Sequence, residues 1–185
     1  MRLVDYLHRN AELYPEKTAA ICGDGKISWR ELSEKVLERS ASFRKGQVVP
    51  FRSSQSIDFL VTYFAIHQAG AVAAPLEKDI PEDRFNEISG LLSSSQVPDG
   101  TADILYTTGT TGKSKGVMIS HRTIIADAEN LIEGQGFSHD LLFIISGPLN
   151  HIGSLSKIFP VPMQGSQQKS LRSWKRTSSI RQIHQ

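Results

Sequence analysis

A loop rich in threonine and glycine constrains this chain more than any other feature. It lies within ILYTTGTTGKSKGVMIS, residues 104–120, and six of the nine residues from Thr107 to Lys115 are threonine or glycine. Glycine lets backbone N–H groups approach an anion closely, threonine hydroxyls donate hydrogen bonds, and lysine neutralises negative charge. This composition is typical of a loop that wraps a polyphosphate.

The common phosphate-binding loop, G-x-x-x-x-G-K-[ST], does not fit. Residues 112–114 match its end, but Thr107 stands where its first glycine is required. That loop also opens directly into a helix, whereas Gly116, Val117 and Ile119 favour an extended segment. Because residues 104–106 are typical of a strand, the sequence predicts strand, loop, strand. A P-loop phosphotransferase and a polar hairpin tip without function are the less favoured alternatives.

The twelve residues YTTGTTGKSKGV, 106–117, resemble the AMP-binding motif of the adenylate-forming superfamily. That superfamily includes acyl-CoA synthetases, the adenylation domains of peptide synthetases, and luciferases. Ser114 departs from the proline that is usual at its position. Residues 14–21, 27–32 and 63–76 resemble further family segments in the same order. The resemblance runs from about Leu3 to Gly165 and implies the N-terminal part of such an enzyme.

The resemblance implies roles for individual residues. Lys115 would pair with the departing pyrophosphate and is the predicted catalytic residue, whereas Lys113 has no predicted role. Asn150 and His151 resemble a later motif that lines the acyl pocket, with His151 beside the substrate carboxylate and Asn150 supporting the turn. By residue type alone, a single histidine after a buried strand is more often an ordinary loop residue. The loop residues that would hold the β- and γ-phosphates of ATP are Thr107, Thr108, Gly109, Thr110, Thr111 and Gly112.

The implied reaction is attack of a carboxylate on the α-phosphorus of ATP, which gives an acyl-adenylate that CoA or an acyl carrier protein can accept. Its barrier is electrostatic, so hydroxyl and N–H donors with a cation are the expected tools. ATP and Mg²⁺ are the implied cofactors. The family segments that carry the metal-binding glutamate, the ribose-binding aspartate and the C-terminal catalytic lysine are absent, so no metal ligand is predicted. We expect the chain alone to turn over little or not at all.

Composition narrows the setting of the chain. With 185 residues, 39% of them hydrophobic and 22% charged, it suits one ordinary globular domain or slightly more. No apolar run approaches the roughly 20 residues that cross a bilayer. The N-terminus lacks the apolar region of a signal peptide. The single cysteine, Cys22, excludes an internal disulfide, which fits a reducing compartment. We therefore expect a cytoplasmic protein.

Hydrophobic periodicity predicts an α/β chain. Ser28 and Glu31 form a capping box at the start of the second predicted helix, and Gly70 ends the third. Helices alternating with strands predict a mostly parallel sheet flanked by helices, which by resemblance is a partial N-terminal subdomain of the adenylate-forming ligase fold. The predicted helices are near residues 3–11, 28–43, 56–69, 81–92 and 121–133, and the predicted strands are at 18–21, 26–29, 71–74, 104–106, 117–119 and 141–145.

The last twenty residues break this pattern. Residues 1–165 are predicted to be the truncated AMP-binding domain, and residues 166–185 read SQQKSLRSWKRTSSIRQIHQ. Although the net charge is only +2, the chain from Leu141 onward carries six basic and no acidic residues. The tail has neither strand nor helix periodicity, so we predict that it is disordered or out of frame. A nucleic-acid-binding tail, supported by Trp174 alone, is disfavoured.

The sequence thus leads to one primary hypothesis: ATP-dependent activation of a small carboxylic acid, on the way to an acyl-CoA. The first alternative is a stable non-catalytic protein that binds ATP or a partner. The second is the P-loop phosphotransferase, in which Lys113 rather than Lys115 is the essential lysine. The choice among fatty, aryl and amino acids is left open.

Overall fold

The computed structural model describes residues 2–23, 25–107, 115–135 and 144–158. Its centre is a four-stranded sheet in the order β3-β4-β5-β6, and β1 and β2 form a separate antiparallel hairpin. The two hairpin strands are β1 (Thr18–Cys22) and β2 (Gly25–Ser28), and the sheet contains β3 (Val48–Arg52), β4 (Val72–Leu76), β5 (Thr101–Thr107) and β6 (Lys115–Ser120).

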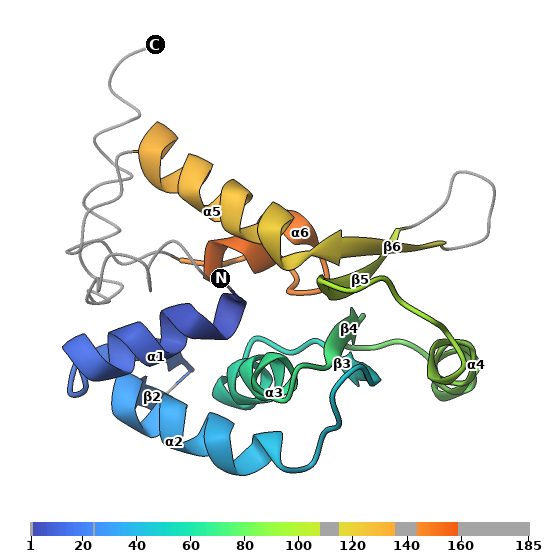
Figure 1. Ribbon diagram of the computed structural model, residues 1–185, viewed down its shortest axis with the longest axis horizontal. Coiled ribbons are helices and arrows are strands. Elements are labelled where there is room, and N and C mark those ends of the chain that lie inside the picture. Colours follow the sequence, from blue (N-terminus) through green and yellow to red (C-terminus); the bar gives the residue numbers. More distant parts are fainter. Residues whose placement is uncertain (1, 24, 108–114, 136–143, 159–185) are drawn as a thin grey trace.

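Helices lie on both sides of this sheet. Figure 1 shows α3 and α4 on opposite sides of β3 and β4, with α1 and α2 beyond α3. The helices are α1 (Leu3–Leu13), α2 (Trp29–Ser40), α3 (Ile57–Gln68), α4 (Glu82–Ser93), α5 (His121–Gln135) and α6 (Ile152–Leu155), which the 3₁₀ turn η1 (Ser156–Ile158) follows. The predicted α/β class is confirmed. None of the described helices is long and apolar enough to cross a membrane.

The sheet is parallel except at one edge. β3 pairs with β4 in parallel from Val48 opposite Val72 to Arg52 opposite Leu76. β4 is also parallel to β5, with Ala73 opposite Asp103, while β5 and β6 are antiparallel. Consequently the carboxyl ends of β3, β4 and β5 lie at the same end of the sheet. The mostly parallel arrangement is as predicted.

Helix boundaries follow from capping chemistry. The predicted capping box of α2 is present: the Ser28 N–H donates to Glu31 Oε2 at 2.8 Å, and the Glu31 N–H donates to Ser28 Oγ at 3.2 Å. Ser56 caps α3 in a similar way by accepting the Phe59 N–H at 3.1 Å. Gly70, with φ of +72°, ends that helix as predicted.

α3 is buried around most of its circumference after its first turn. Val61 and Phe64 are buried, and so are Tyr63, Ile66 and His67. A helix covered on most sides has no single apolar stripe for periodicity to detect. Periodicity alone therefore does not show how deeply α3 lies in the core.

Two strand predictions were incomplete. β3 was not predicted, and β4 continues through Pro75 instead of ending before it. The Val72 N–H donates to Gln47 O and the Ser53 N–H donates to Leu76 O. The backbone polar groups of alternate β4 residues therefore point toward β3, and those of Pro75 point toward β5. β4 pairs with β5 at one register position, Ala73 opposite Asp103, and Pro75 on that side has no N–H to extend the ladder, while the pairing with β3 continues past it.

The predicted strand at 141–145 is not seen in its described part. Residues 141–143 lie outside the described residues, and Ile144 and Ile145 have no strand structure. The Ile145 carbonyl accepts a side-chain hydrogen bond from Gln55 at 3.4 Å. For residues 141–143 the strand stays a prediction.

Candidate functional site

The stem of the predicted phosphate loop is an antiparallel hairpin. β5 and β6 pair from Thr101 opposite Ser120 to Thr107 opposite Lys115, so the two ends of the loop face each other. Both end residues are exposed, and Thr107 Oγ1 donates to the Lys115 carbonyl at 3.5 Å. This confirms the predicted strand–loop–strand and argues against a Walker loop, which would open into a helix. The candidate phosphate ligands Thr108, Gly109, Thr110, Thr111 and Gly112 lie outside the described residues.

Gly116 lets the stem close tightly. A Cβ at this position would lie 2.9 Å from Ile104 Cγ2 and 3.4 Å from Tyr106 Cζ, and the first of these distances is closer than ordinary van der Waals contact. Ile104 and Tyr106 are part of the core on the α4 side of the sheet. Glycine next to Lys115 therefore keeps the first residues of β6 against β5, which fixes the base of the loop.

A second candidate region lies at the ends of β3 and β4. A cavity of about 710 Å³ is lined there by residues 53–55, residues 77–79, Ser146 and residues 148–151, which include Asn150 and His151. The sequence-predicted substrate residues are thus adjacent and line one cavity. The carboxyl ends of β3, β4 and β5 point the same way because the three strands are parallel. Thr107, at the base of the loop, and this cavity therefore lie at the same end of the strands.

Asn150 and His151 differ in their surroundings. Asn150 is 5% exposed, and its Oδ1 accepts a hydrogen bond of 3.4 Å from Ser53 Oγ. His151 is exposed and precedes α6 without a side-chain capping bond. Asn150 is therefore held from across the cavity, whereas the His151 imidazole is accessible. Their roles toward a substrate stay predictions.

The turn that carries these two residues is closely packed. Gln55 Nε2 donates to the Gly147 carbonyl at 2.9 Å. A Cβ on Gly147 would lie 2.3 Å from Ser154 Oγ of α6, so any side chain there would have to displace that hydroxyl. The sequence analysis did not single out Gln55 or Ser53, because glutamine and serine after a short unpredicted strand carry no distinctive pattern.

His121 begins α5 but does not cap it. Ser120 Oγ accepts the Thr123 N–H at 3.1 Å and does the capping. His121 Nδ1 instead faces the Leu3 N–H at 3.4 Å, and its ring lies 5.3 Å from that of His67. Burial first, and then the nearby His67, lower the pKa of His121 to about 4. Sequence reasoning missed this buried group because its members are far apart in the chain.

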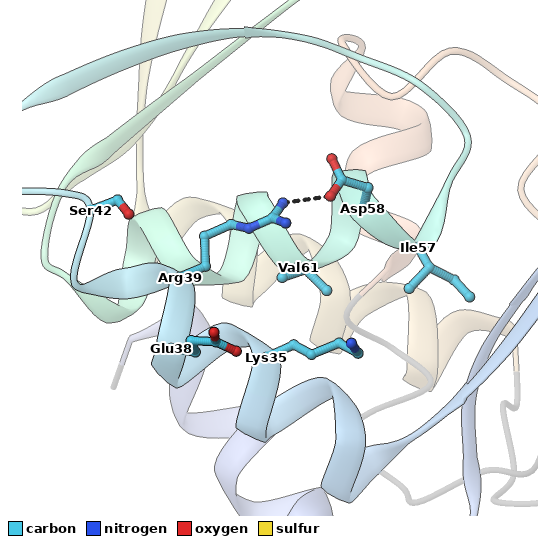
Figure 2. Close-up of a pocket in the computed structure, with 7 residues that line it drawn as sticks. All are labelled: Lys35, Glu38, Arg39, Ser42, Ile57, Asp58 and Val61. Carbon is cyan, nitrogen blue, oxygen red and sulfur yellow. Dashed lines mark hydrogen bonds and ion pairs between the residues drawn. The ribbon is translucent and has the colours of Figure 1, made fainter.

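A second hollow, of about 450 Å³, lies between α2 and α3. Figure 2 shows its lining, with the Arg39 guanidinium reaching the Asp58 carboxylate. Arg39 Nη1 donates to Asp58 Oδ1 at 2.6 Å and to Thr62 Oγ1 at 2.7 Å. Arg39 and Asp58 are thus paired with each other, and the other two charged residues of the lining, Lys35 and Glu38, carry opposite charges. Among the described residues, no group of three or more His, Cys, Asp or Glu side chains could hold a metal ion.

Comparison with known proteins identifies the family to which this chain belongs. The model of the family described as "AMP-binding enzyme" matches residues 7–95 and 90–185. The match reaches the predicted tail, which lies outside the described residues. A component of the plipastatin synthase of Bacillus subtilis is 26% identical over 167 residues, which cover 67% of this chain and 6% of that protein. Bacitracin synthase 3 from Bacillus licheniformis is 27% identical in an alignment of 202 positions that covers 86% of this chain and 3% of that protein.

Solved structures share the fold. The N-terminal subdomain of NpsA from Klebsiella oxytoca, in complex with 3-hydroxyanthranilyl-AMSN, superposes with a TM-score of 0.75 and 23% identity. The match covers 95% of this chain and 56% of that one. The o-succinylbenzoate CoA synthetase MenE from Bacillus subtilis, with ATP and magnesium, has a TM-score of 0.71 and 20% identity over 95% of this chain and 60% of its own. The chain thus spans a small part of the curated relatives and little more than half of these structures.

Proposed function

This chain belongs to the family of AMP-binding enzymes, and we propose that it is the phosphate-binding part of a ligase that activates a carboxylic acid with ATP. A carboxylate oxygen attacks the α-phosphorus, the bond from that phosphorus to the pyrophosphate oxygen breaks, and acyl-adenylate and pyrophosphate are the products. Thr107, the loop residues 108–112 and Lys115 are the proposed phosphate ligands. Lys115 neutralises charge on the departing pyrophosphate.

The observation that carries this proposal is the hairpin stem beneath the loop. Thr107 and Lys115 face each other at its end, so a hydroxyl and an ammonium group are held at the base of a loop made of threonine and glycine. These donors suit a polyphosphate, since they combine hydrogen bonds with a positive charge. Magnesium would come with the phosphates, because it is usually bound through them and keeps several waters.

The cavity beside Asn150 and His151 is the proposed place for the acid. In parallel sheets, ligands bind outside the carboxyl ends of the strands, and this cavity lies at the ends of β3 and β4. Its lining includes Glu77 and Asp79 as well as Lys78. The exposed His151 imidazole is proposed to lie beside the substrate carboxylate, with the buried Asn150 holding the turn.

The thiol that accepts the acyl group is the finer part of the proposal. CoA was the acceptor expected from the sequence, and one similar structure is named a CoA synthetase. Another is described as a nonribosomal peptide synthetase, with a TM-score of 0.76 and 15% identity. We propose a thioester product in either case, formed on CoA or on a carrier protein, with parts of the ligase that this chain does not contain.

Binding of Mg·ATP by three lysine variants tests the phosphate site. We expect Lys115→Ala to weaken binding at least tenfold in calorimetric titration, because the proposed phosphate counter-charge is lost. Lys113→Ala should bind like the wild type. Lys26→Ala is the matched control, since Lys26 is an exposed lysine on the other hairpin, β1–β2.

The same titration separates the alternatives. Loss of binding in Lys113→Ala with normal binding in Lys115→Ala would support the P-loop phosphotransferase instead. A longer chain that includes the missing ligase segments provides the second comparison. If it binds ATP but exchanges no labelled pyrophosphate into ATP with any carboxylic acid, the non-catalytic alternative gains. Carboxylate-dependent exchange in that longer chain would establish acid activation.

A further inference from the structure

Four polar side chains gather in the core beneath the hairpin stem: Tyr63 and His67 of α3, Asp103 of β5, and His121 at the start of α5. The first three are fully buried. Tyr63 Oη donates to Asp103 Oδ2 at 2.8 Å, and His67 Nε2 lies 3.3 Å from Asp103 Oδ1. The His67 ring is 4.5 Å from the Tyr63 ring and 5.3 Å from the His121 ring. We call these four residues the polar cluster.

The polar cluster touches both strands of the stem at their ends away from the loop. Asp103 is the β5 residue in register with β4, opposite Ala73. His121 directly follows β6, and its Nδ1 faces the Leu3 N–H of α1 at 3.4 Å. Through these residues α1, α3 and the two strands of the hairpin meet at one point. A change of charge in the cluster therefore acts on the base of the hairpin.

The polar cluster surrounds one buried carboxylate, Asp103. A carboxylate buried there needs an opposite charge or hydrogen bonds, and the Tyr63 hydroxyl supplies one bond. Burial, followed by the Asp103 carboxylate, raises the pKa of Tyr63 well above its usual value, so this hydroxyl stays a donor. A proton taken up by His121 would place a positive charge 5.3 Å from the His67 ring, and His67 is one of the causes that lower the pKa of His121.

Charged and titratable groups from α1, α3 and β5 shift the pKa of His121. Burial is the largest cause that lowers its pKa to about 4, followed by His67 of α3. Asp103 of β5 and Asp5 of α1 oppose this shift, and Arg2 adds to it. The contact with Leu3 also favours the neutral form of His121, since only an unprotonated Nδ1 can accept the Leu3 N–H.

We propose that the polar cluster is a pH-sensitive anchor for the β5–β6 hairpin, locked while His121 is neutral and released when His121 takes up a proton. The folded state binds that proton more weakly than the unfolded state, whose histidine has an ordinary pKa of about 6.5. The contribution of the anchor to stability is therefore complete above about pH 6.5. It is lost as the pH falls from there toward 4. This inference does not depend on what the loop binds.

Denaturant unfolding of the full chain between pH 7 and pH 5 is the first test. We expect the wild-type midpoint to fall, and His121→Asn to remove most of that fall, because an asparagine oxygen near the Nδ1 position can still accept the Leu3 N–H but does not titrate. His8→Asn is the matched control. His8 also lies on the α1–α3 contact, 2.6 Å from Gln68 Oε1, but it is exposed, so this variant should keep the wild-type fall.

Two measurements locate the effect. Proton NMR should show the His121 ring titrating near pH 4, and His67→Gln should move that midpoint upward, since the repelling neighbour is gone while Asp103 remains. Amide exchange, corrected for its intrinsic rate, should become at least tenfold less protected at residues 104–106 and 117–119 at pH 5 than at pH 7. The α4 amides should change much less.

Three results would overturn the proposal. One is a His121 ring that titrates at the ordinary value of about 6.5. Another is an equal loss of protection in the hairpin and in α4, which would indicate global unfolding. The third is a full fall of the midpoint in His121→Asn. If that variant fails to fold, the wild-type titration and exchange still decide the question.

Discussion

The two faces of the four-stranded sheet differ in thickness and in chemistry. On the α3 side, residues from α1, α2, α3 and α5 form one large core, which includes Trp29, Tyr63 and Phe64. On the α4 side, a single helix covers the sheet, and Leu91 of that helix is 60% exposed. The buried residues of the smaller core there are Val48, Val72, Ala74, Leu76, Ile88, Leu92 and Ile104, with Tyr106 partly buried against them.

Buried titratable groups occur on the thick side. Asp103 and His67 are both fully buried; His67 belongs to α3, and Asp103 of β5 lies against it. Such groups persist only where opposite charges and hydrogen bonds can be held around them, which requires packing from several elements. The comparison teaches that the thick face buries a carboxylate and an imidazole completely at the base of the hairpin, whereas Tyr106 on the thin face is only partly buried.

The same substitution on the two faces should give the largest contrast. We expect Ile66→Ala on α3 to cost about 4 kcal/mol, in the upper part of the usual range for buried isoleucine, because Ile66 is fully buried and its neighbours are held on all sides. Ile88→Ala on α4 should cost about 2 kcal/mol, since a single covering helix can move into the space. Urea unfolding with an unchanged slope measures both values. Equal costs would show that the faces are equally rigid.

The start of α2 offers a test of intermediate size. Ser28→Ala removes the hydroxyl that accepts the Glu31 N–H, so we expect a loss of about 1 kcal/mol. Ser40→Ala is the control at the other end of the helix, where the hydroxyl donates to the Leu37 carbonyl and caps no free N–H. On the thin face, α4 begins at Pro81 without a side-chain cap. A loss no larger than that of the control would mean that packing alone fixes the start of α2.

The smallest effect is expected on the surface of α4. Glu87→Gln breaks an exposed ion pair with Arg84, and such pairs contribute less than about 0.5 kcal/mol. The effect should shrink further in high salt, because the pair is screened. Thermal unfolding at low and high ionic strength measures it. A loss above about 1 kcal/mol that persists in salt would show that α4 depends on this pair for more than surface charge.

Local chemistry explains why much of the fold was predictable. The capping box at Ser28, the positive φ at Gly70 and the strand–loop–strand around residues 107–115 each depend on residues close in sequence, and all three are present. The missed features depend on distant partners. β3 needs β4 beside it, and α3 is buried by elements from the whole chain. Pro75 lies in a strand because β3 pairs with β4 along its whole length, whereas β5, on the side where proline lacks an N–H, pairs with β4 at one position.

The candidate site divides in the same way. The order of threonine, glycine and lysine in the loop and the pair Asn150–His151 were visible as patterns, and the family match agrees with the former. The cavity that joins Asn150 to Ser53, 97 residues away in the chain, was not visible. The contact of His121 with Leu3 was not visible either, because the two residues are 118 positions apart in the chain.

The sequence by itself determined the family of this chain, the hairpin that carries the loop, and the residue types of the proposed phosphate loop, because each depends on short-range backbone preferences and side-chain chemistry. Only the tertiary structure showed that the base of the loop and the cavity lie at the same end of the strands. It alone also brought the half-buried His121 against the buried Tyr63, His67 and Asp103. Burial and the distances between charges arise from packing, and packing joins residues that no local pattern connects.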